Sequence, residues 1–259
     1  NDWFTERGAK YTIQVAMYKD IATITLDTTG SGLHTRGYRV EAVEAPIKET
    51  MAAGLVQLSF WHPERRLIDP FCGSGTILIE AAMMARNIAP GLGKKFASEQ
   101  WDAVPMKVWR DAKTSAYDAI DQTPREKEFM MRGTDIDPAA VEAAKLNADT
   151  AGVAEDIIFE EKDVHDLWID RQYGIMISNP PYGQRISDFQ SLNQMYISLH
   201  KTFKKKFGWS VYVLTGDKMF PRYFKRARPD RVRKLFNGNL EVNYYQYYGD
   251  RPPKPADKE

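Results

Sequence analysis

The sequence predicts an α/β fold, a mostly parallel doubly wound sheet of seven strands that ends in an antiparallel hairpin. Two observations support this prediction. From residue 67 to residue 214, short apolar runs alternate with segments of helical spacing, the pattern of β-α units in a parallel sheet. The chain then adds two β-rich runs joined at Asn237-Gly238-Asn239, a strong signal for a hairpin.

Each predicted strand is short, rich in apolar or β-branched residues, and bounded by residues that end it. A glycine-bearing turn follows the first strand, acidic residues follow the second and third, and two prolines follow the fourth. The strands are expected at residues 67–69, 129–134, 157–160, 175–179, 209–214, 231–236 and 240–248.

Helices are predicted where apolar residues recur every three or four positions. Ile47, Met51 and Leu55 define the first helix, and Pro46 suits its opening turn. The segment 139–150 is alanine-rich and reads as a helix throughout. The predicted helices occupy residues 47–61, 77–86, 105–122, 139–150, 188–207 and 218–224, with one further helical turn at 165–168.

A second hairpin is predicted ahead of the sheet, from two β-rich runs at residues 10–17 and 21–27. A hairpin alone is marginally stable in water, so we expect it to be the end of a larger N-terminal module. Residues 87–122 form an insertion without a predicted function. The expected divisions are an N-terminal remnant and linker at 1–40, the main domain at 41–248 and a flexible tail at 249–259.

Composition limits the class of protein. With 259 residues, 43% of them hydrophobic, the chain can bury one full-sized core. No run of about 18 apolar residues and no secretory leader is present, so we expect neither a membrane span nor secretion. The single cysteine, Cys72, fits a reducing cytoplasm. Four scattered histidines and one cysteine offer no metal-ligand spacing, so no metal is expected.

The net charge of +1 hides an asymmetry along the chain. Between Lys201 and Lys234, twelve Lys and Arg residues stand against two acids, a local charge of +10 that leaves −9 for the remainder. This segment is a candidate phosphate-contacting face, although a solvated helix followed by a basic loop would show the same pattern. The residues chosen as candidates for nucleic-acid binding are Lys204, Lys205, Arg226 and Arg228.

The stretch from Ile175 to Gly183 carries the most specific chemical signal. Its apolar start reads as a buried strand, and two consecutive prolines then forbid helix and further ladder pairing after Asn179. The carbonyl of Pro180 is left exposed, because the following proline has no N–H to offer. The tip of the strand therefore holds an amide side chain, a free carbonyl and the aromatic ring of Tyr182.

Such a tip suits the methylation of a planar amino group. The lone pair of that nitrogen is delocalised, so the nitrogen is a poor nucleophile until both N–H bonds are held by acceptors. The side-chain oxygen of Asn179 and the carbonyl of Pro180 would be those acceptors and would aim the lone pair at a methyl donor. Tyr182 would stack on the flat substrate. The alternative is that Asn-Pro-Pro-Tyr is only a rigid turn after a strand.

A second signal lies at the end of the first predicted strand. Asp69 precedes a turn that contains Gly73 and Gly75, and a helix follows. Glycines let the backbone approach a ligand, and a helix N-terminus offers free N–H donors. Asp135 ends the next strand, the standard position for holding ribose hydroxyls. Asp163 follows the third strand and would accept a bond from an adenine amino group, cap the helical turn after it, or do both.

These motifs resemble those of class I S-adenosylmethionine-dependent amino-methyltransferases. More narrowly, the chain is similar to the bacterial THUMP-domain RNA methyltransferases, the large-subunit rRNA guanine-N2 methyltransferases often labelled N6-adenine-specific DNA methylase. The passage from Leu26 to Arg39 resembles the exit of that family from its THUMP domain. The motifs that carry the resemblance are Asp69-Pro-Phe-Cys-Gly-Ser-Gly-Thr76, Thr134-Asp-Ile-Asp-Pro138, Lys162-Asp163 and Asn179-Pro-Pro-Tyr182.

The resemblance implies a Rossmann-like fold, S-adenosyl-L-methionine as cofactor, and RNA, most specifically 23S rRNA, as partner. Asp69, Gly73 and Gly75 would line the methionine part of the cofactor, and the motif adds Phe71 and Thr76 to this set. Asp135 would hold the ribose hydroxyls, Ile136 would pack on the adenine, and Asp163 would contact the adenine amino group. The catalytic set would be Asn179, Pro180 and Tyr182.

The predicted reaction is direct transfer of a methyl group to guanine N2 of an unstacked base, without a covalent enzyme intermediate. Three alternatives remain at this point. Methylation of adenine N6 in DNA or RNA uses the same tip, and so does methylation of a protein glutamine, which the +10 segment disfavours. The alternative from a different class is a non-catalytic RNA-binding module, which would not bind S-adenosylmethionine.

Overall fold

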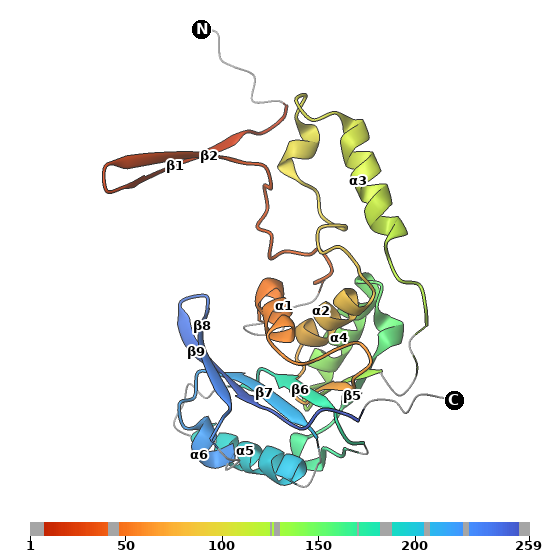
Figure 1. The fold of residues 1–259 in the computed structure, drawn as a ribbon, viewed down its shortest axis with the longest axis vertical. Helices are drawn as coiled ribbons and strands as arrows, with labels where there is room; N and C mark the ends of the chain where they lie inside the picture. Colours follow the sequence, from red (N-terminus) through yellow and green to blue (C-terminus); the bar gives the residue numbers. More distant parts are fainter. Residues whose placement is uncertain are drawn as a thin grey trace. The chain divides into compact units, whose positions relative to one another are not determined.

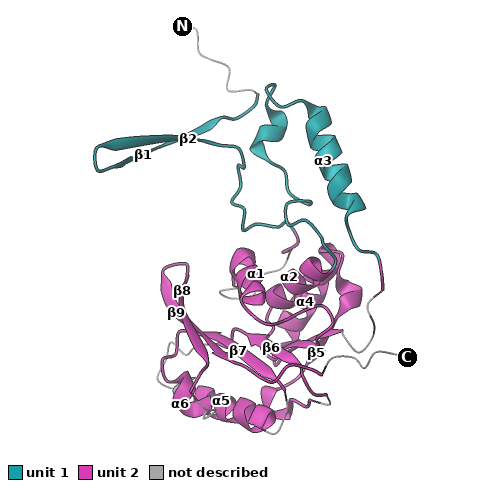
Figure 2. Cartoon of the chain, viewed as in Figure 1, with its two compact units in different colours: residues 1–37, 86–122 teal, residues 38–85, 123–259 magenta. Residues whose placement is uncertain are grey.

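The computed structural model describes residues 8–40, 47–124, 126, 130–169, 171–181, 188–204, 208–224 and 228–253. The chain folds into two compact units (Figure 2). One contains residues 1–37 and 86–122, and the other contains residues 38–85 and 123–259. The second unit carries the sheet that the sequence predicts.

The central sheet has seven strands in the order β5-β4-β3-β6-β7-β9-β8. Five strands are parallel, and β9 pairs antiparallel with both β7 and β8. The predicted fold class, a mostly parallel doubly wound sheet with a terminal antiparallel hairpin, is therefore confirmed. The strands are β3 Leu67–Asp69, β4 Met131–Asp135, β5 Ile157–Glu161, β6 Ile175–Ser178, β7 Ser210–Thr215, β8 Arg231–Asn237 and β9 Leu240–Tyr247.

Helices cover both faces of this sheet (Figure 1). On one face lie α1 Glu49–Gln57, α2 Thr76–Ala85 and α4 Pro138–Thr150, and on the other lie α5 Asp188–Lys204 and α6 Phe220–Phe224. Two short 3-10 turns, η3 Ala154–Asp156 and η4 Val164–Asp166, flank β5. Within the described residues no helix has the length and apolar character needed to cross a membrane.

The first helix is shorter than predicted. The expected span was 47–61, whereas α1 begins at Glu49 and ends at Gln57. Apolar spacing continues past the end, but the Ser59 hydroxyl donates to the Val56 carbonyl and the Trp61 indole donates to the Arg65 carbonyl, which turns the chain into β3. Pro46 lies outside the described residues.

The two faces bury different cores. Toward α5 and α6, an aromatic and aliphatic cluster includes Met176 and Val213 from the sheet with Tyr196 and Phe220 from the helices. Toward α2, a Cβ on Gly133 would come within 2.8 Å of Leu78, so helix and strand pack in close contact there. This close packing fixes the strand ends that carry the candidate site.

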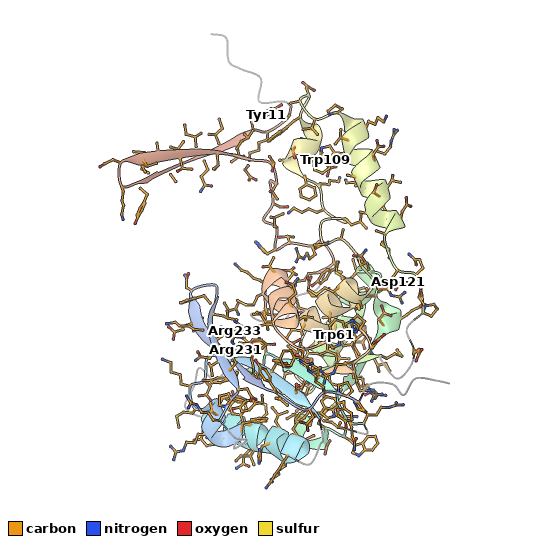
Figure 3. All side chains as sticks on the ribbon, viewed as in Figure 1. Tyr11, Trp61, Trp109, Asp121, Arg231 and Arg233 are labelled. Carbon is orange, nitrogen blue, oxygen red and sulfur yellow. The ribbon has the colours of Figure 1, made fainter. Side chains whose placement is uncertain are left out.

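The other unit joins the N-terminal hairpin to the insertion. The hairpin is β1 Thr12–Tyr18 with β2 Ile21–Asp27, and the insertion contains η1 Ala97–Gln100 and α3 Met106–Asp118. Lys94 Nζ donates to Ser31 Oγ at 2.7 Å, and the Trp101 ring stacks on Tyr11 with centroids 4.8 Å apart. Trp109 donates from its indole to the Ser98 carbonyl at 3.3 Å (Figure 3). The insertion therefore packs on the N-terminal segment, a relation that the sequence pattern did not predict.

Candidate active site

Three predicted cofactor-binding acids and Asn179 meet at one edge of the sheet. β3, β4, β5 and β6 are parallel, so their carboxyl ends lie side by side. Asp69 ends β3, Asp135 ends β4, Asp163 follows β5, and Asn179 follows β6. The strand order reverses between β3 and β6, because the chain proceeds from β3 to β4 and β5 on one side and then to β6 and β7 on the other; such a switch point is the usual ligand-binding position of a doubly wound sheet.

A buried hydrogen bond joins the two strands at the centre of this edge. The Ser178 hydroxyl donates to Asp69 Oδ1, which also accepts from the Phe71 N–H at 3.1 Å. The side chains of Asp69 and Ser178 are buried. Burial raises the pKa of Asp69 to about 7, the two hydrogen bonds oppose that rise, and the negative charge of Asp135 adds to it. Asp69 therefore links the glycine-bearing turn to β6, the strand that Asn179 follows.

The turn after β3 is held against β4. The Gly73 N–H donates to Asp135 Oδ2 at 2.9 Å, and the Cys72 N–H donates to the Thr134 carbonyl at 3.0 Å. Cys72 is buried, and burial raises the pKa of its thiol, so the thiol is not activated as a nucleophile. This agrees with a reaction that needs no covalent enzyme intermediate.

Gly75 has a packing role as well as a conformational one. Its φ is +81°, in the left-handed region that glycine adopts without strain. A Cβ at this position would lie 2.9 Å from Phe159 Cζ and 3.1 Å from Ala144 Cβ. Side chains of the core therefore occupy the place where a Cβ on residue 75 would lie. The absence of that Cβ lets α2 start close to the sheet.

Both oxygens of Asp135 accept backbone N–H groups. Oδ2 binds Gly73, and Oδ1 accepts from the Asp137 N–H at 3.1 Å. Each carboxylate oxygen keeps further lone-pair capacity, so the half-buried Asp135 still offers acceptors to a ligand. Next to it, Ile136 is 67% exposed, an apolar side chain on the surface at the strand end.

Asp163 caps the turn η4, one of the two roles open to it. Its Oδ1 accepts the His165 N–H at 2.9 Å and lies 2.7 Å from His165 Nδ1. The backbone hydrogen bond from His165 is the main cause that lowers the pKa of Asp163. Because both contacts involve Oδ1, Oδ2 remains an acceptor for a ligand.

Two other members of the predicted cofactor set contribute to packing. Thr76 is the first residue of α2 and is buried, and its hydroxyl accepts from Arg39 Nη2 at 3.0 Å. Phe71 is partly buried and packs against the cluster on the α5 side of the sheet.

The side-chain oxygen of Asn179 is an exception to the satisfied polar groups of this edge. Asn179 Oδ1 is buried and accepts no hydrogen bond from any residue that the structure describes. Buried acceptors are almost always paired, so an unpaired one at a strand tip marks a position for a donor from a ligand. Pro180, whose carbonyl was expected to be exposed, is a buried residue, whereas Pro181 is exposed; Tyr182 lies outside the described residues.

A small cavity of about 80 Å³ opens beside this edge, next to Asp69, Pro70 and Thr134. Thr134 Oγ1 is buried, and among the described residues it has no hydrogen-bond partner. Sequence reasoning missed both Ser178 and Thr134. For Ser178 the available signal was a polar residue at the end of an otherwise apolar strand, whereas the strand of Thr134 also contains Arg132 and Asp135, so no such signal marked Thr134.

Two of the residues predicted to bind nucleic acid lie far from Asn179. Lys204 ends α5, which joins two parallel strands and therefore runs back to the amino edge of the sheet. Arg228 precedes β8, whose first residue pairs with Gln246 beside the amino half of β7. Both side chains are exposed at the edge opposite Asn179. Lys205 and Arg226 lie outside the described residues.

In the part of the chain that the structure describes, no three His, Cys, Asp or Glu side chains gather in a way that would hold a metal ion.

The fold and the carboxyl-edge site together define a Rossmann-like methyltransferase. The family described as "RMKL-like, methyltransferase domain" matches residues 36–246, and the chain belongs to this family. S-adenosylmethionine is the cofactor of this class. The residues present fit it, because a glycine-bearing turn, the acid Asp135 and the Oδ2 acceptor of Asp163 meet at one edge.

Similar proteins support this assignment. The chain is 42% identical over 254 residues to "Putative RNA methyltransferase YpsC" of Bacillus subtilis (strain 168), covering 98% of this chain and 65% of that protein. It is 38% identical over 242 residues to "Ribosomal RNA large subunit methyltransferase K/L" of Shewanella baltica (strain OS185), covering 92% of this chain and 34% of that protein.

A solved structure agrees with the fold. It is described as "Crystal structure of SMU.472, a putative methyltransferase complexed with SAH", and it is 38% identical with a TM-score of 0.87, covering 96% of this chain and 64% of that chain. The chain thus spans less than two thirds of the length of each of these three proteins.

Proposed function

We propose that the protein transfers a methyl group from S-adenosylmethionine to an exocyclic amino group of a base in RNA, guanine N2 of 23S rRNA. The observation that carries the reaction is the buried oxygen of Asn179, which no described residue bonds, at the carboxyl edge of the sheet. RNA as the substrate class is supported by the names of the relatives in Bacillus subtilis and Shewanella baltica.

The chemistry follows from two acceptors on one rigid segment. Asn179 Oδ1 and the carbonyl of Pro180 would accept the two N–H bonds of the amino group and turn its lone pair toward the methyl donor. S-adenosylmethionine supplies an electrophilic methyl group on a sulfonium. Transfer forms one N–C bond and breaks one S–C bond, and the nitrogen loses a proton to solvent. Tyr182 would stack on the base and hold it in the plane that this transfer needs.

The cofactor would lie along the ends of β3, β4 and β5. Asp69, Gly73 and Gly75 would hold its methionine part, with Phe71 and Thr76 supporting the turn. Asp135 would accept from the ribose hydroxyls, Ile136 would pack on the adenine, and Asp163 would accept from the adenine amino group through Oδ2. The exposed apolar surface of Ile136 and the spare acceptors of Asp135 and Asp163 support this arrangement.

The site indicates the type of reaction more specifically than it indicates the target base. Guanine N2, adenine N6 and cytosine N4 each present two N–H bonds, so the tip alone does not choose among them. The resemblance to guanine-N2 methyltransferases selects guanine, and adenine N6 is the alternative. The expected division of the chain, with a THUMP-type remnant at residues 1–40, remains a proposal that supports an RNA substrate.

The test uses the full-length protein that carries this chain. Calorimetric titration with S-adenosylmethionine separates an enzyme from a non-catalytic RNA-binding module, which would not bind it. Incubation with unmodified 23S rRNA and labelled cofactor, followed by nuclease digestion and mass analysis, should yield N2-methylguanosine. N6-methyladenosine would keep the mechanism and overturn the choice of base.

Asn179 variants test the mechanism itself. Asn179→Ala should lose turnover by roughly 10²–10³ while it still binds the cofactor, the scale for removing one hydrogen-bonding group of a transition state. Asn179→Asp is the matched control, because it keeps an acceptor of the same size and should lose less. Full activity of Asn179→Ala would contradict the role given to the tip.

A further inference from the structure

The β8–β9 hairpin extends beyond the rest of the sheet at the edge that carries Asn179. The β7–β9 ladder ends at the pair Thr215 and Asn243, whereas the β8–β9 ladder continues to Asn237 and Leu240 (Figure 1). Three further residues per strand correspond to about 10 Å. Because β9 is antiparallel to β7, the turn of the hairpin lies at the carboxyl edge of the parallel strands.

This hairpin carries an exposed aromatic ring among cations. Phe236 is 57% exposed, and Lys234 Nζ lies 5.7 Å from the centre of its ring. Lys234 is also paired with Glu241 at 2.6 Å. Arg231 and Arg233 lie on the other face of β8 (Figure 3). The Nε of Arg233 is buried, and it has no hydrogen-bond partner among the described residues.

A hollow separates the turn of the hairpin from the start of α1. Its volume is about 390 Å³, within the range of sites that hold small ligands. It offers a side-chain amide, a hydroxyl, a cation and the open backbone of a glycine with φ +62°. The residues that line it are Lys48, Thr50, Met51, Phe236, Asn237 and Gly238. Tyr244, the partner of Arg233 in the ladder, donates to the Leu55 carbonyl of α1, so the α1 side of β8 carries Arg233 and Asn237, and the Phe236 ring lies on the opposite face.

The hollow lies a short distance from the predicted target base. β6, which ends at the tip, is followed in the sheet by β7, β9 and β8. Neighbouring strands are about 4.8 Å apart, so the hairpin lies roughly 10–15 Å from the strand that presents Asn179. A base drawn out to Asn179 would therefore bring the nucleotides beside it to this part of the surface.

The position of β8 at the edge of the sheet explains only some of the exposed residues of the hairpin. β8 is an edge strand, and charged residues on an edge strand prevent pairing with other chains. That role accounts for Arg231 and Lys234. It does not account for an exposed phenylalanine at the turn or for a hollow beside it, which a protective edge does not need.

We propose that the β8–β9 hairpin is an RNA-contacting element, and that the hollow beside it takes a nucleotide adjacent to the target base. In the hollow, the Asn237 amide bonds to the edge of that base, and Lys48 and Arg233 neutralise neighbouring phosphates. On the opposite face of the hairpin, Phe236 stacks on the next base. This inference rests on the proposed function and adds to it the surface that positions the RNA at the catalytic edge. RNA fits this surface because stacking and phosphate contacts together use all of its groups.

Three variants of the full-length protein test the proposal with 23S rRNA transcribed in vitro. Phe236→Ala should weaken RNA binding about 5- to 150-fold and raise KM, the range expected for losing one base stack. Phe236→Trp should retain binding, because it keeps the stacking surface. Val232→Ala is the matched control, since Val232 lies on the same face of the same strand, is 46% exposed and is four residues farther from the turn.

The outcomes separate this proposal from the proposed function. Binding of S-adenosylmethionine and the unfolding midpoint should be the same in all three variants and the parent, because Phe236 and Val232 are 57% and 46% exposed and neither belongs to the buried core. If the parent methylates the RNA and Phe236→Ala binds it as tightly as Val232→Ala does, the hairpin proposal is wrong and the proposed function stands. If the parent neither binds nor methylates RNA, the proposed function fails first.

Discussion

Asp69 gives the sharpest test of how the site is built. Burial raises its pKa to about 7, so between about pH 4 and pH 7 the folded protein holds a proton that the unfolded chain, with a pKa of 3.8, has released. Stability rises with pH only where the unfolded state binds more protons, and here the folded state binds more. The contribution of Asp69 is therefore fully present below about pH 4 and is lost as pH rises through about 7.

The size of the effect follows from the shift. From 3.8 to about 7 is roughly three pKa units, and each unit corresponds to about 1.4 kcal/mol. Asp69→Asn keeps the volume and an acceptor for the Ser178 hydroxyl but cannot ionise. We therefore expect the unfolding free energy of the parent, relative to this variant, to fall by on the order of 4 kcal/mol between pH 4 and pH 8.

Urea denaturation of both proteins at several pH values measures this difference, and titrations common to both proteins cancel. Ser178→Ala supplies a second arm. The Ser178 hydrogen bond lowers the pKa of Asp69, so its removal should carry the loss of stability to higher pH. A stability difference between parent and Asp69→Asn that stays constant over this range would refute a buried, protonated Asp69.

Three further predictions concern the cofactor turn and the basic segment. Asp135→Ala removes the acceptor of the Gly73 N–H and of the proposed ribose hydroxyls, and calorimetry should show cofactor binding weaker by about 1–3 kcal/mol. Gly75→Ala should lower the unfolding free energy by about 1–3 kcal/mol, because its Cβ would meet Phe159, whereas Gly54→Ala in α1 meets nothing within 4 Å and should raise it by about 0.5–1 kcal/mol. RNA affinity should fall steeply with salt, and removing the charge of a residue that contacts phosphate should reduce the slope of log affinity against log salt concentration by roughly one unit. The residues to be changed are Lys204, Lys205, Arg226 and Arg228. Binding that does not depend on salt would show that they are ordinary surface residues.

Local pattern was enough for most of the sheet. The apolar runs locate the strands. The prolines after Asn179 end one strand, and Asn237-Gly238-Asn239 marks the turn between the last two, because the backbone chemistry of these residues acts within a few positions. The end of α1 was missed because apolar spacing continues through Leu58, whereas the chain is turned by bonds from Ser59 and Trp61 that spacing does not register.

Contacts between distant residues were beyond the reach of the pattern. Ser178 and Asp69 are 109 residues apart, and only the pairing of β3 with β6 brings them together. Lys94 reaches Ser31 across 63 residues, so nothing near residue 94 indicates that the insertion packs on the N-terminal segment. The acids at the strand ends were found because a parallel sheet places all its carboxyl ends at one edge, a rule that needs no knowledge of individual contacts.

The polarity of the strands also decides which cations can serve the reaction. The basic segment from Lys201 to Lys234 begins at the amino edge of the sheet, where Lys204 and Arg228 lie, and reaches the carboxyl edge at Lys218 after β7 and along β8. A phosphate held at the amino edge stabilises the complex without fixing the position of the target base, because the length of the sheet separates the two. A nucleotide held at Phe236 lies within roughly 10–15 Å of the strand that presents Asn179, which is close enough to restrict how the base approaches. We therefore expect changes at the amino edge to alter affinity and its salt dependence, and changes at the hairpin to alter the choice of nucleotide as well.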